Sequence, residues 1–401
     1  LLNLTLLGLL LKVASANFGR RGLVVATALA LASPLLWFVN KGHTEFFTVC
    51  LATTGVIWFL KRRYGRTVLA LGIVSTQNPP FLLVALLVVA LGIVRDGPKM
   101  VRHWVGCLAG MLVGCLHPLY YFIRHGNVTP QLITGAASGE GKGFREWTCF
   151  LVDPDVGLFS NWPWLIVPLL AVLAVTFWRK QKPDWSVICF CFLAVTILCW
   201  AQTKTNNFNH GGTIKISRYA LWYLPFLYPL LDRFARNYPL VPVWQRGAAV
   251  AFLLAALVVN TTKFYPDRKE SFLFQTTIAE NFYEVCPGLY NPIPEIFIER
   301  CLQAELPTDQ WAISNRSGTK VIVHSGRLIK QQNWLRHGKK LDGIGGCEKR
   351  IDPEKLVRVI QQRDQTPDAI EWFYINAPGD IFLEMDVPVL SASDEPKNVL
   401  R

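Results

Sequence analysis

Charged residues are scarce in this sequence. Asp, Glu, Lys and Arg together account for 17% of 401 residues, whereas hydrophobic residues account for 51%. A soluble protein of this length rarely has such a balance. Acidic residues are fewer than basic ones, 28 against 41, and the excess cations gather in short clusters beside apolar runs: Arg20-Arg21, Lys61 to Arg66 and Arg179 to Lys182. Such clusters are typical of cytoplasmic loops of membrane proteins, so we expect no nucleic-acid partner.

Signals for metal binding and for a leader peptide are also lacking. No CxxC pair or Cys/His spacing typical of zinc occurs among the ten cysteines. Six of them lie in apolar runs, where a thiol behaves as a small hydrophobe: Cys50, Cys107, Cys115, Cys189, Cys191 and Cys199. The chain begins at Leu1 inside an apolar stretch, without the basic region or cleavage site of a signal peptide. We therefore expect further residues to precede Leu1.

Long apolar runs dominate the chain from Leu1 to about Asn260, and the sequence becomes charged from Lys263 onwards. A helix needs about 20 apolar residues to cross a bilayer. The predicted spans are roughly 2–16, 22–39, 45–60, 67–77, 80–94, 101–123, 163–178, 185–200, 219–231 and 245–260. The sequence thus predicts a polytopic α-helical membrane protein with about nine or ten spans in residues 1–262. A C-terminal soluble α+β domain is expected in residues 263–401.

The basic clusters predict an orientation. If 67–77 and 80–94 are separate passes, all the basic loops fall on one face of the membrane, which is then cytoplasmic. The opposite face carries Asn40 to Glu45, the Asn78-Pro79-Pro80 turn, the loops 124–163 and 201–218, and the C-terminal domain. We expect an integral membrane protein, in the plasma or inner membrane if bacterial, with an extracytoplasmic C-terminal domain.

The C-terminal domain shows strand-like runs at 320–324, 369–375 and 381–385, and helix-like runs at 294–304 and 353–362. It contains no nucleophile and base pair, phosphate loop or metal spacing, so we expect no catalysis of its own. Four cysteines fall on the outer face in this topology: Cys149, Cys286, Cys301 and Cys347. Cys286 with Cys301 is the first disulfide to consider, although the sequence does not fix the pairing.

Two polar segments on the outer face are candidate sites. His43-Thr44-Glu45 opens a helix, where Thr44 can cap the helix and Glu45 meets the positive end of its dipole. His43 and Glu45 could instead line a polar cavity. Asp153 and Asp155 precede an aromatic span, and two carboxylates there can act on a proton, a sugar hydroxyl or a divalent cation. The alternative is that Asp153-Pro154 only starts a turn.

A third segment runs from Asn206 to Tyr219 and concentrates amide, imidazole and guanidinium groups close to the next span. We predict a phosphate site there, because a guanidinium at the level of lipid phosphates binds them through two hydrogen bonds. Arg218 should matter more than Lys215, which lies further out in the loop. The predicted binding residues are Asn209, His210, Lys215, Arg218 and Tyr219. An ordinary flexible loop with interface anchors is the alternative.

These segments together resemble a known family. The motifs "HTE", "KRRYGR", "LALGIVSTQNPPFLLV", "HPLYYFIRHGN", "DPDVGLFSNWPWLIVPLL" and "GGTIKISRYALWYLPFLYPLL" are similar to those of the multi-spanning GT-C glycosyltransferases, which use polyprenyl-phosphate-linked sugars. The resemblance covers roughly residues 1–260. The family's usual catalytic acid lies in the first outer loop, and this sequence shows no such loop. Either that loop precedes Leu1 or the chain is not a complete enzyme.

The resemblance implies a membrane glycosyltransferase that moves a sugar from a polyprenyl-phosphate donor to an acceptor on the non-cytoplasmic face. It implies that Arg218 pairs with the lipid phosphate, that Tyr219 fixes the guanidinium, and that Asn209 and His210 contact phosphate or sugar. The expected partners are the lipid-linked donor, membrane lipid and an acceptor that the sequence does not identify. No cofactor is certain, and a divalent cation is the one candidate. A transporter or flippase of lipid-linked intermediates and a non-catalytic scaffold are the alternatives.

Overall fold

The computed structural model describes residues 1–134, 143–165, 184–209, 216–238, 243–265, 273–304, 312–324, 344–346 and 372–376, with the single positions 168, 170 and 356. The chain forms two compact units, Leu1–Phe272 and Leu273–Arg401. Each unit is described by itself.

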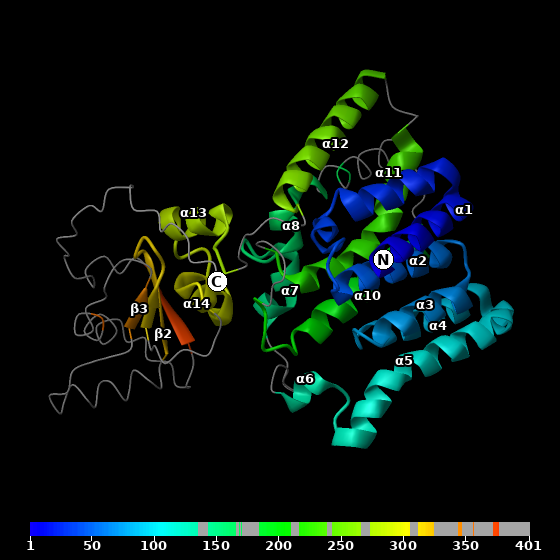
Figure 1. The fold of residues 1–401 in the computed structure, drawn as a ribbon, viewed down its shortest axis with the longest axis horizontal. Helices are drawn as coiled ribbons and strands as arrows, with labels where there is room; N and C mark the ends of the chain where they lie inside the picture. Colours follow the sequence, from blue (N-terminus) through cyan, green and yellow to red (C-terminus); the bar gives the residue numbers. More distant parts are fainter. Residues whose placement is uncertain are drawn as a thin grey trace. The chain divides into compact units, whose positions relative to one another are not determined.

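The first unit is helical (Figure 1). Its α-helices are α1 (Leu2–Leu31), α2 (Thr44–Leu60), α3 (Tyr64–Ser75), α4 (Phe81–Asp96), α5 (Trp104–His125), α6 (Pro130–Ile133), α7 (Phe144–Val152), α8 (Leu158–Asn161), α10 (Trp185–Gln202), α11 (Tyr228–Asn237) and α12 (Val243–Lys263). Short 3₁₀ helices lie between them: η1 (Pro34–Phe38), η2 (Gly97–His103), η3 (Pro163–Leu165) and η4 (Arg218–Leu227). Helix α2 contacts α1, α3 and η4, so it lies at the centre of this unit.

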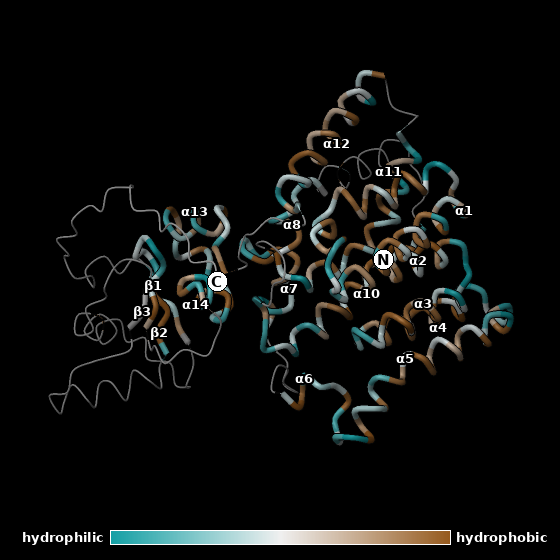
Figure 2. Tube along the Cα trace, in the orientation of Figure 1, coloured by the Kyte–Doolittle hydropathy of each residue, from teal (hydrophilic) through white to brown (hydrophobic). Residues whose placement is uncertain are grey.

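Four helical runs in the described residues are long and apolar enough to cross a membrane: Leu2–Leu31, Phe81–Ile133, Trp185–Gln202 and Arg246–Lys263. Figure 2 shows hydrophobic residues along most of these helices, with hydrophilic residues gathered in the connections. A polytopic helical protein is thus supported by length and composition. The number is smaller than the nine or ten spans expected, because α2 and α3 have only 17 and 12 residues and because α4 and α5 are counted together in the run Phe81–Ile133. Most of the expected span 163–178 lies outside the described residues.

Two predicted spans differ in detail from the structure. The expected helices 2–16 and 22–39 correspond to the two parts of α1, which are separated by a sharp kink at Gly19, where φ is +62° and ψ is −148°, but the second part is shorter than expected. That part ends at Leu31, and Ser33 then caps η1 through the backbone N–H of Leu35. The expected helix 219–231 begins as the 3₁₀ helix η4 and becomes α-helical only at Tyr228. Pro225 lies inside η4 and has no N–H to donate, so a regular α-helix cannot form through it.

Helices α3 and α5 pack backbone to backbone through glycines. Gly106, Gly110 and Gly114 recur every four residues on α5 and so share one face of that helix. A Cβ on Gly110 would lie 2.5 Å from the carbonyl group of Val68, and one on Gly72 would lie 2.0 Å from the Gly110 oxygen. Small residues at this spacing allow membrane helices to approach closely. This glycine pattern was not among the features predicted from the sequence.

The second unit is a small α+β structure. Helices α13 (Thr277–Val285) and α14 (Pro294–Leu302) accompany a four-stranded sheet in the order β3-β1-β2-β4. Its strands are β1 (Ala312–Ser314), β2 (Lys320–His324), β3 (Ile344–Gly346) and β4 (Trp372–Asn376). Strand β1 pairs antiparallel with β2 and parallel with β3, and β2 pairs antiparallel with β4. The core residues are Ala279, Tyr283, Tyr290, Phe297, Ile298, Cys301, Ile313 and Ile322.

The expected strands at 320–324 and 369–375 correspond to β2 and β4, whereas the runs at 353–362 and 381–385 lie outside the described residues. The expected disulfide between Cys286 and Cys301 is wrong, because both are free thiols. Cys301 is buried in the core and accepts a hydrogen bond from Gln275, whereas Cys286 caps the end of α13. Cys149 is also a free thiol.

Candidate functional site

The site is built on the first turn of α2. Glu45 lies in that turn, at the positive end of the helix dipole, and its side chain is only 1% exposed. His43 is the N-terminal cap residue, in extended backbone conformation, and its Nδ1 contacts the Glu45 carboxylate. The prediction that Thr44 caps this helix is wrong. Thr44 is the first helical residue, and its hydroxyl donates to Glu45 Oε2 at 3.3 Å.

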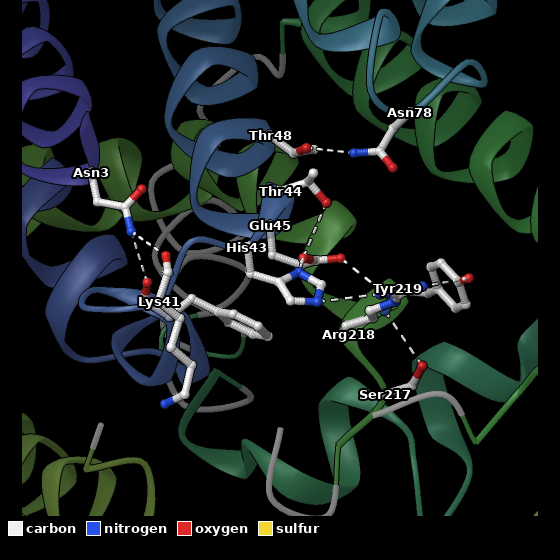
Figure 3. A network of polar contacts seen from close by, with 11 residues as sticks. Asn3, Lys41, His43, Thr44, Glu45, Thr48, Asn78, Ser217, Arg218 and Tyr219 are labelled. Carbon is white, nitrogen blue, oxygen red and sulfur yellow. Dashed lines mark hydrogen bonds and ion pairs between the residues drawn. The ribbon is translucent and has the colours of Figure 1, made fainter. Parts of the chain in front are cut away.

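Arg218, at the first position of η4, completes the cluster (Figure 3). Its Nη1 lies 3.3 Å from His43 Nε2, and its Nε lies 3.8 Å from Glu45 Oε1. Its Nη2 donates to the Tyr219 hydroxyl at 3.2 Å. A buried carboxylate loses several kcal/mol of hydration, and the contacts with His43, Thr44 and Arg218 offset that cost. The structure therefore joins two segments 175 residues apart into one polar network.

The loop that carries His43 is held from two sides. Asn3 on α1 donates to the carbonyl groups of Phe38, Val39 and Lys41 at 3.0, 3.1 and 2.7 Å. The Phe38 ring lies 5.2 Å from the imidazole of His43, between ring centroids. These contacts fix the approach of the chain to α2, and so fix the imidazole beside Glu45.

The start of η4 is held equally firmly. Ser217 is the cap residue of η4, and its own N–H donates to the carbonyl of Val156 at 3.1 Å. Gln202, at the end of α10, donates to the Tyr219 carbonyl at 3.0 Å. The Tyr219 ring packs edge-on against Phe150 of α7, with centroids 5.5 Å apart. Arg218 is thus fixed at its backbone while its side chain stays 20% exposed.

Asp153 and Asp155 lie in the turn that contacts Ser217. One oxygen of Asp153 accepts from the backbone N–H groups of Asp155 and Val156, at 2.8 and 3.1 Å. That is the turn-forming geometry of an Asp side chain. Asp155 is fully buried in the same turn. The structure therefore gives Asp153 a structural role in shaping this turn, and the turn supports the residue before Arg218.

The remaining predicted residues are placed only in part. Asn209 is buried, and the neighbouring Phe208 stacks on Phe150. His210 and Lys215 lie outside the described residues. One polar contact was not predicted: the amide of Asn78 donates to the Thr48 hydroxyl at 2.5 Å, one helical turn beyond Glu45. The Gln-Asn-Pro-Pro turn was noted in the sequence, but nothing in it indicated this partner.

The hydrogen-bond donors and possible metal ligands of the cluster decide what it can bind. Within the described part of the chain, no group of three or more His, Cys, Asp and Glu side chains could hold a metal ion. Arg218 carries five N–H donors, and among described residues only two of them meet hydrogen-bond acceptors, His43 and Tyr219. A partly exposed guanidinium with unused donors is suited to an anion with several oxygens, such as a phosphate.

The chain matches no protein-family model, no curated protein and no solved structure in the three comparisons made. The assignment of a function therefore rests on the chemistry of the Glu45, His43 and Arg218 cluster and on the apolar helices that carry it.

Proposed function

We propose that this chain is a membrane glycosyltransferase that moves a sugar from a polyprenyl-phosphate donor to an acceptor on the non-cytoplasmic face. The observation that carries the proposal is the Arg218 guanidinium, which is anchored by buried Glu45 and by Tyr219 yet retains donors for an anion. The resemblance of residues 1–260 to GT-C enzymes supports the same substrate class.

The reaction explains why a fixed cation is useful. When a sugar leaves a phosphodiester, the bond between its anomeric carbon and the phosphate oxygen breaks. The electron pair stays on that oxygen, so the phosphate gains negative charge in the transition state. A guanidinium already in place stabilises this charge without reorganisation. The donor lipid needs an apolar surrounding, and helices α1, α5, α10 and α12 present exposed large hydrophobic side chains of the kind that face lipid.

The planar geometry of the guanidinium gives the test. Arg218→Lys keeps the charge but loses bidentate hydrogen bonding, a change worth about 1.5–3 kcal/mol for a charged group. Sugar transfer from a polyprenyl-phosphate donor should therefore fall about 10- to 150-fold at equal protein levels. Arg145→Lys is the matched control, because Arg145 is exposed and pairs with the adjacent Glu146 at 2.9 Å. That variant should transfer at the wild-type rate.

Two results would contradict the proposal. Equal transfer by the Arg218→Lys and Arg145→Lys variants would show that the phosphate does not meet Arg218. Donor binding without any transfer by the wild-type protein would favour a transporter or flippase, or a non-catalytic scaffold.

A further inference from the structure

The two nitrogens of the His43 ring have different partners, Glu45 at Nδ1 and Arg218 at Nε2. A guanidinium can only donate hydrogen bonds, so the contact with Arg218 Nη1 at 3.3 Å requires a lone pair on His43 Nε2. The other nitrogen, Nδ1, then carries the hydrogen and donates it to the Glu45 carboxylate. In this arrangement Nε2 is the acceptor nitrogen of the ring, and it is directed at the residue that would bind an anion.

The groups around the imidazole leave Nε2 as the nitrogen that a bound anion can affect. The Phe38 ring covers one side of the imidazole. Lys41, two residues before His43, lies over the Trp37 ring at 3.4 Å and donates to the Trp37 carbonyl. The His43 side chain is 32% exposed, so protons can reach it.

On the side of η4, the described titratable groups nearest in sequence or in the supporting turn are Arg218, Tyr219, Asp153 and Asp155. The Tyr219 hydroxyl accepts a hydrogen bond from Arg218, and the Asp153 carboxylate accepts one from the backbone N–H of Asp155. Asp155 is fully buried in that turn. Glu45 is the one carboxylate in contact with the imidazole among the described residues.

An anion bound to Arg218 would change this balance. A phosphate oxygen at hydrogen-bond distance from Nη1 lies within about 6 Å of His43 Nε2, because Nη1 is 3.3 Å from that nitrogen. An opposite charge at about 4–6 Å favours the charged form of a titratable group. Glu45 already places negative charge on the other nitrogen. When Arg218 Nη1 turns from Nε2 to the phosphate, it also frees the Nε2 lone pair. A proton added at Nε2 then has Glu45 on one side of the ring and the phosphate on the other.

We propose that His43 is the second hydrogen-bond donor of this anion site, after Arg218. It becomes a donor toward the anion by taking up a proton. Binding of a phosphate group to Arg218 is accompanied by uptake of one proton at His43 Nε2, and the resulting imidazolium donates to the same phosphate. The inference rests on the proposed role of Arg218 and adds to it: the site takes its anion together with a proton. His43 is thus a binding residue of the site, and Glu45 is the positioning residue that orients its ring.

The test is calorimetric titration of the purified full chain in detergent at pH 7.5. The probe is farnesyl methyl phosphodiester, whose acidic group does not titrate near neutral pH, so it contributes no protons of its own. Repeating the titration in two buffers of different ionisation enthalpy gives the number of protons taken up. Inorganic sulfate is the parallel probe and separates a free tetrahedral anion from a lipid headgroup. His43→Asn retains a donor toward Glu45 but has no nitrogen at the Nε2 position, and Arg218→Gln removes the cation.

The wild-type protein should take up close to one proton for each phosphodiester bound. His43→Asn should bind the phosphodiester about tenfold more weakly, because it loses one hydrogen bond to a charged group. It should take up no proton on binding. Equal proton uptake by wild type and His43→Asn, or unchanged affinity in His43→Asn, would overturn the inference. In that case loss of binding in Arg218→Gln would leave the proposed function standing. Wild-type binding by Arg218→Gln would overturn both. Proton-coupled binding of sulfate at equal affinity would support the role of His43 and assign the site to free anions.

Discussion

Lys320 is a buried cation on β2 of the C-terminal unit. Its ammonium group donates to the side-chain oxygens of Asn291 and Asn376, the former at 2.5 Å. Burial lowers the pKa of Lys320 from 10.5 to about 8. The folded unit therefore disfavours the charged lysine, and this penalty is fully present below pH 8. Between pH 8 and 10.5 the folded unit releases the proton while the unfolded chain retains it, so the free energy of unfolding rises with pH.

We expect the gain across this window to be at most about 3 kcal/mol. Hydrogen exchange of the β2 and β4 amides, corrected for intrinsic exchange, measures it at pH 7.5 and 9.5. The matched variant is Lys320→Met, which keeps the length of the side chain and removes its titration. Its sheet should lose the rise in protection with pH. The same rise in both proteins would assign the effect to other groups.

Single residues were predicted better than their partners. Glu45, His43 and Arg218 were identified from their type and their position beside a predicted span. Their mutual contacts were not, because they depend on how α2 packs against η4. For Asp153 the sequence left chemistry and a turn as alternatives, and the structure shows one of its oxygens bound to the backbone of its own turn.

Among the elements, the packing of α3 against α5 gives the sharpest prediction. A Cβ added to Gly110 would lie 2.5 Å from backbone atoms of Val68, so the two helices must move apart. Gly110→Ala should therefore destabilise the protein by about 1–3 kcal/mol, the usual cost of overpacking. Gly247→Ala is the control, because that helical glycine on α12 has no atom within 4 Å of an added Cβ. Alanine there should be neutral or stabilising, since it favours helix.

Thermal unfolding in detergent, followed by loss of helical circular dichroism, compares the two alanine variants. The wild-type midpoint should lie well above that of Gly110→Ala and no higher than that of Gly247→Ala. Equal midpoints for the two variants would show that α3 and α5 do not pack through Gly110.

The nature of η4 could not be predicted from apolar content. Residues 219–231 have the composition of a span, but Ser217 caps a 3₁₀ helix and Pro225 prevents regular α-helical bonding. Runs of 3₁₀ helix longer than a few residues are uncommon. Here the run fixes Arg218 at its start, where Gln202 and Val156 hold the adjoining backbone.

For the whole molecule, the testable property is orientation in the membrane. The basic loops predict that residues 61–66 face the cytoplasm and that the C-terminal unit faces away. Arg63 and Arg316 are exposed and lie in these two regions, so both positions suit a cysteine probe. In intact cells an impermeant thiol reagent should label Arg316→Cys above the parent protein, and Arg63→Cys only after permeabilisation. Labelling of both from one side would exclude this topology.

The account depends on where the donor phosphate binds, and a structure of the protein with a polyprenyl-phosphate-linked sugar measures this most directly. Cryo-electron microscopy in a lipid nanodisc should show the phosphate about 3 Å from the Arg218 guanidinium, with His43 beside it. A phosphate bound elsewhere, with Arg218 still paired only with His43, Glu45 and Tyr219, would contradict the account.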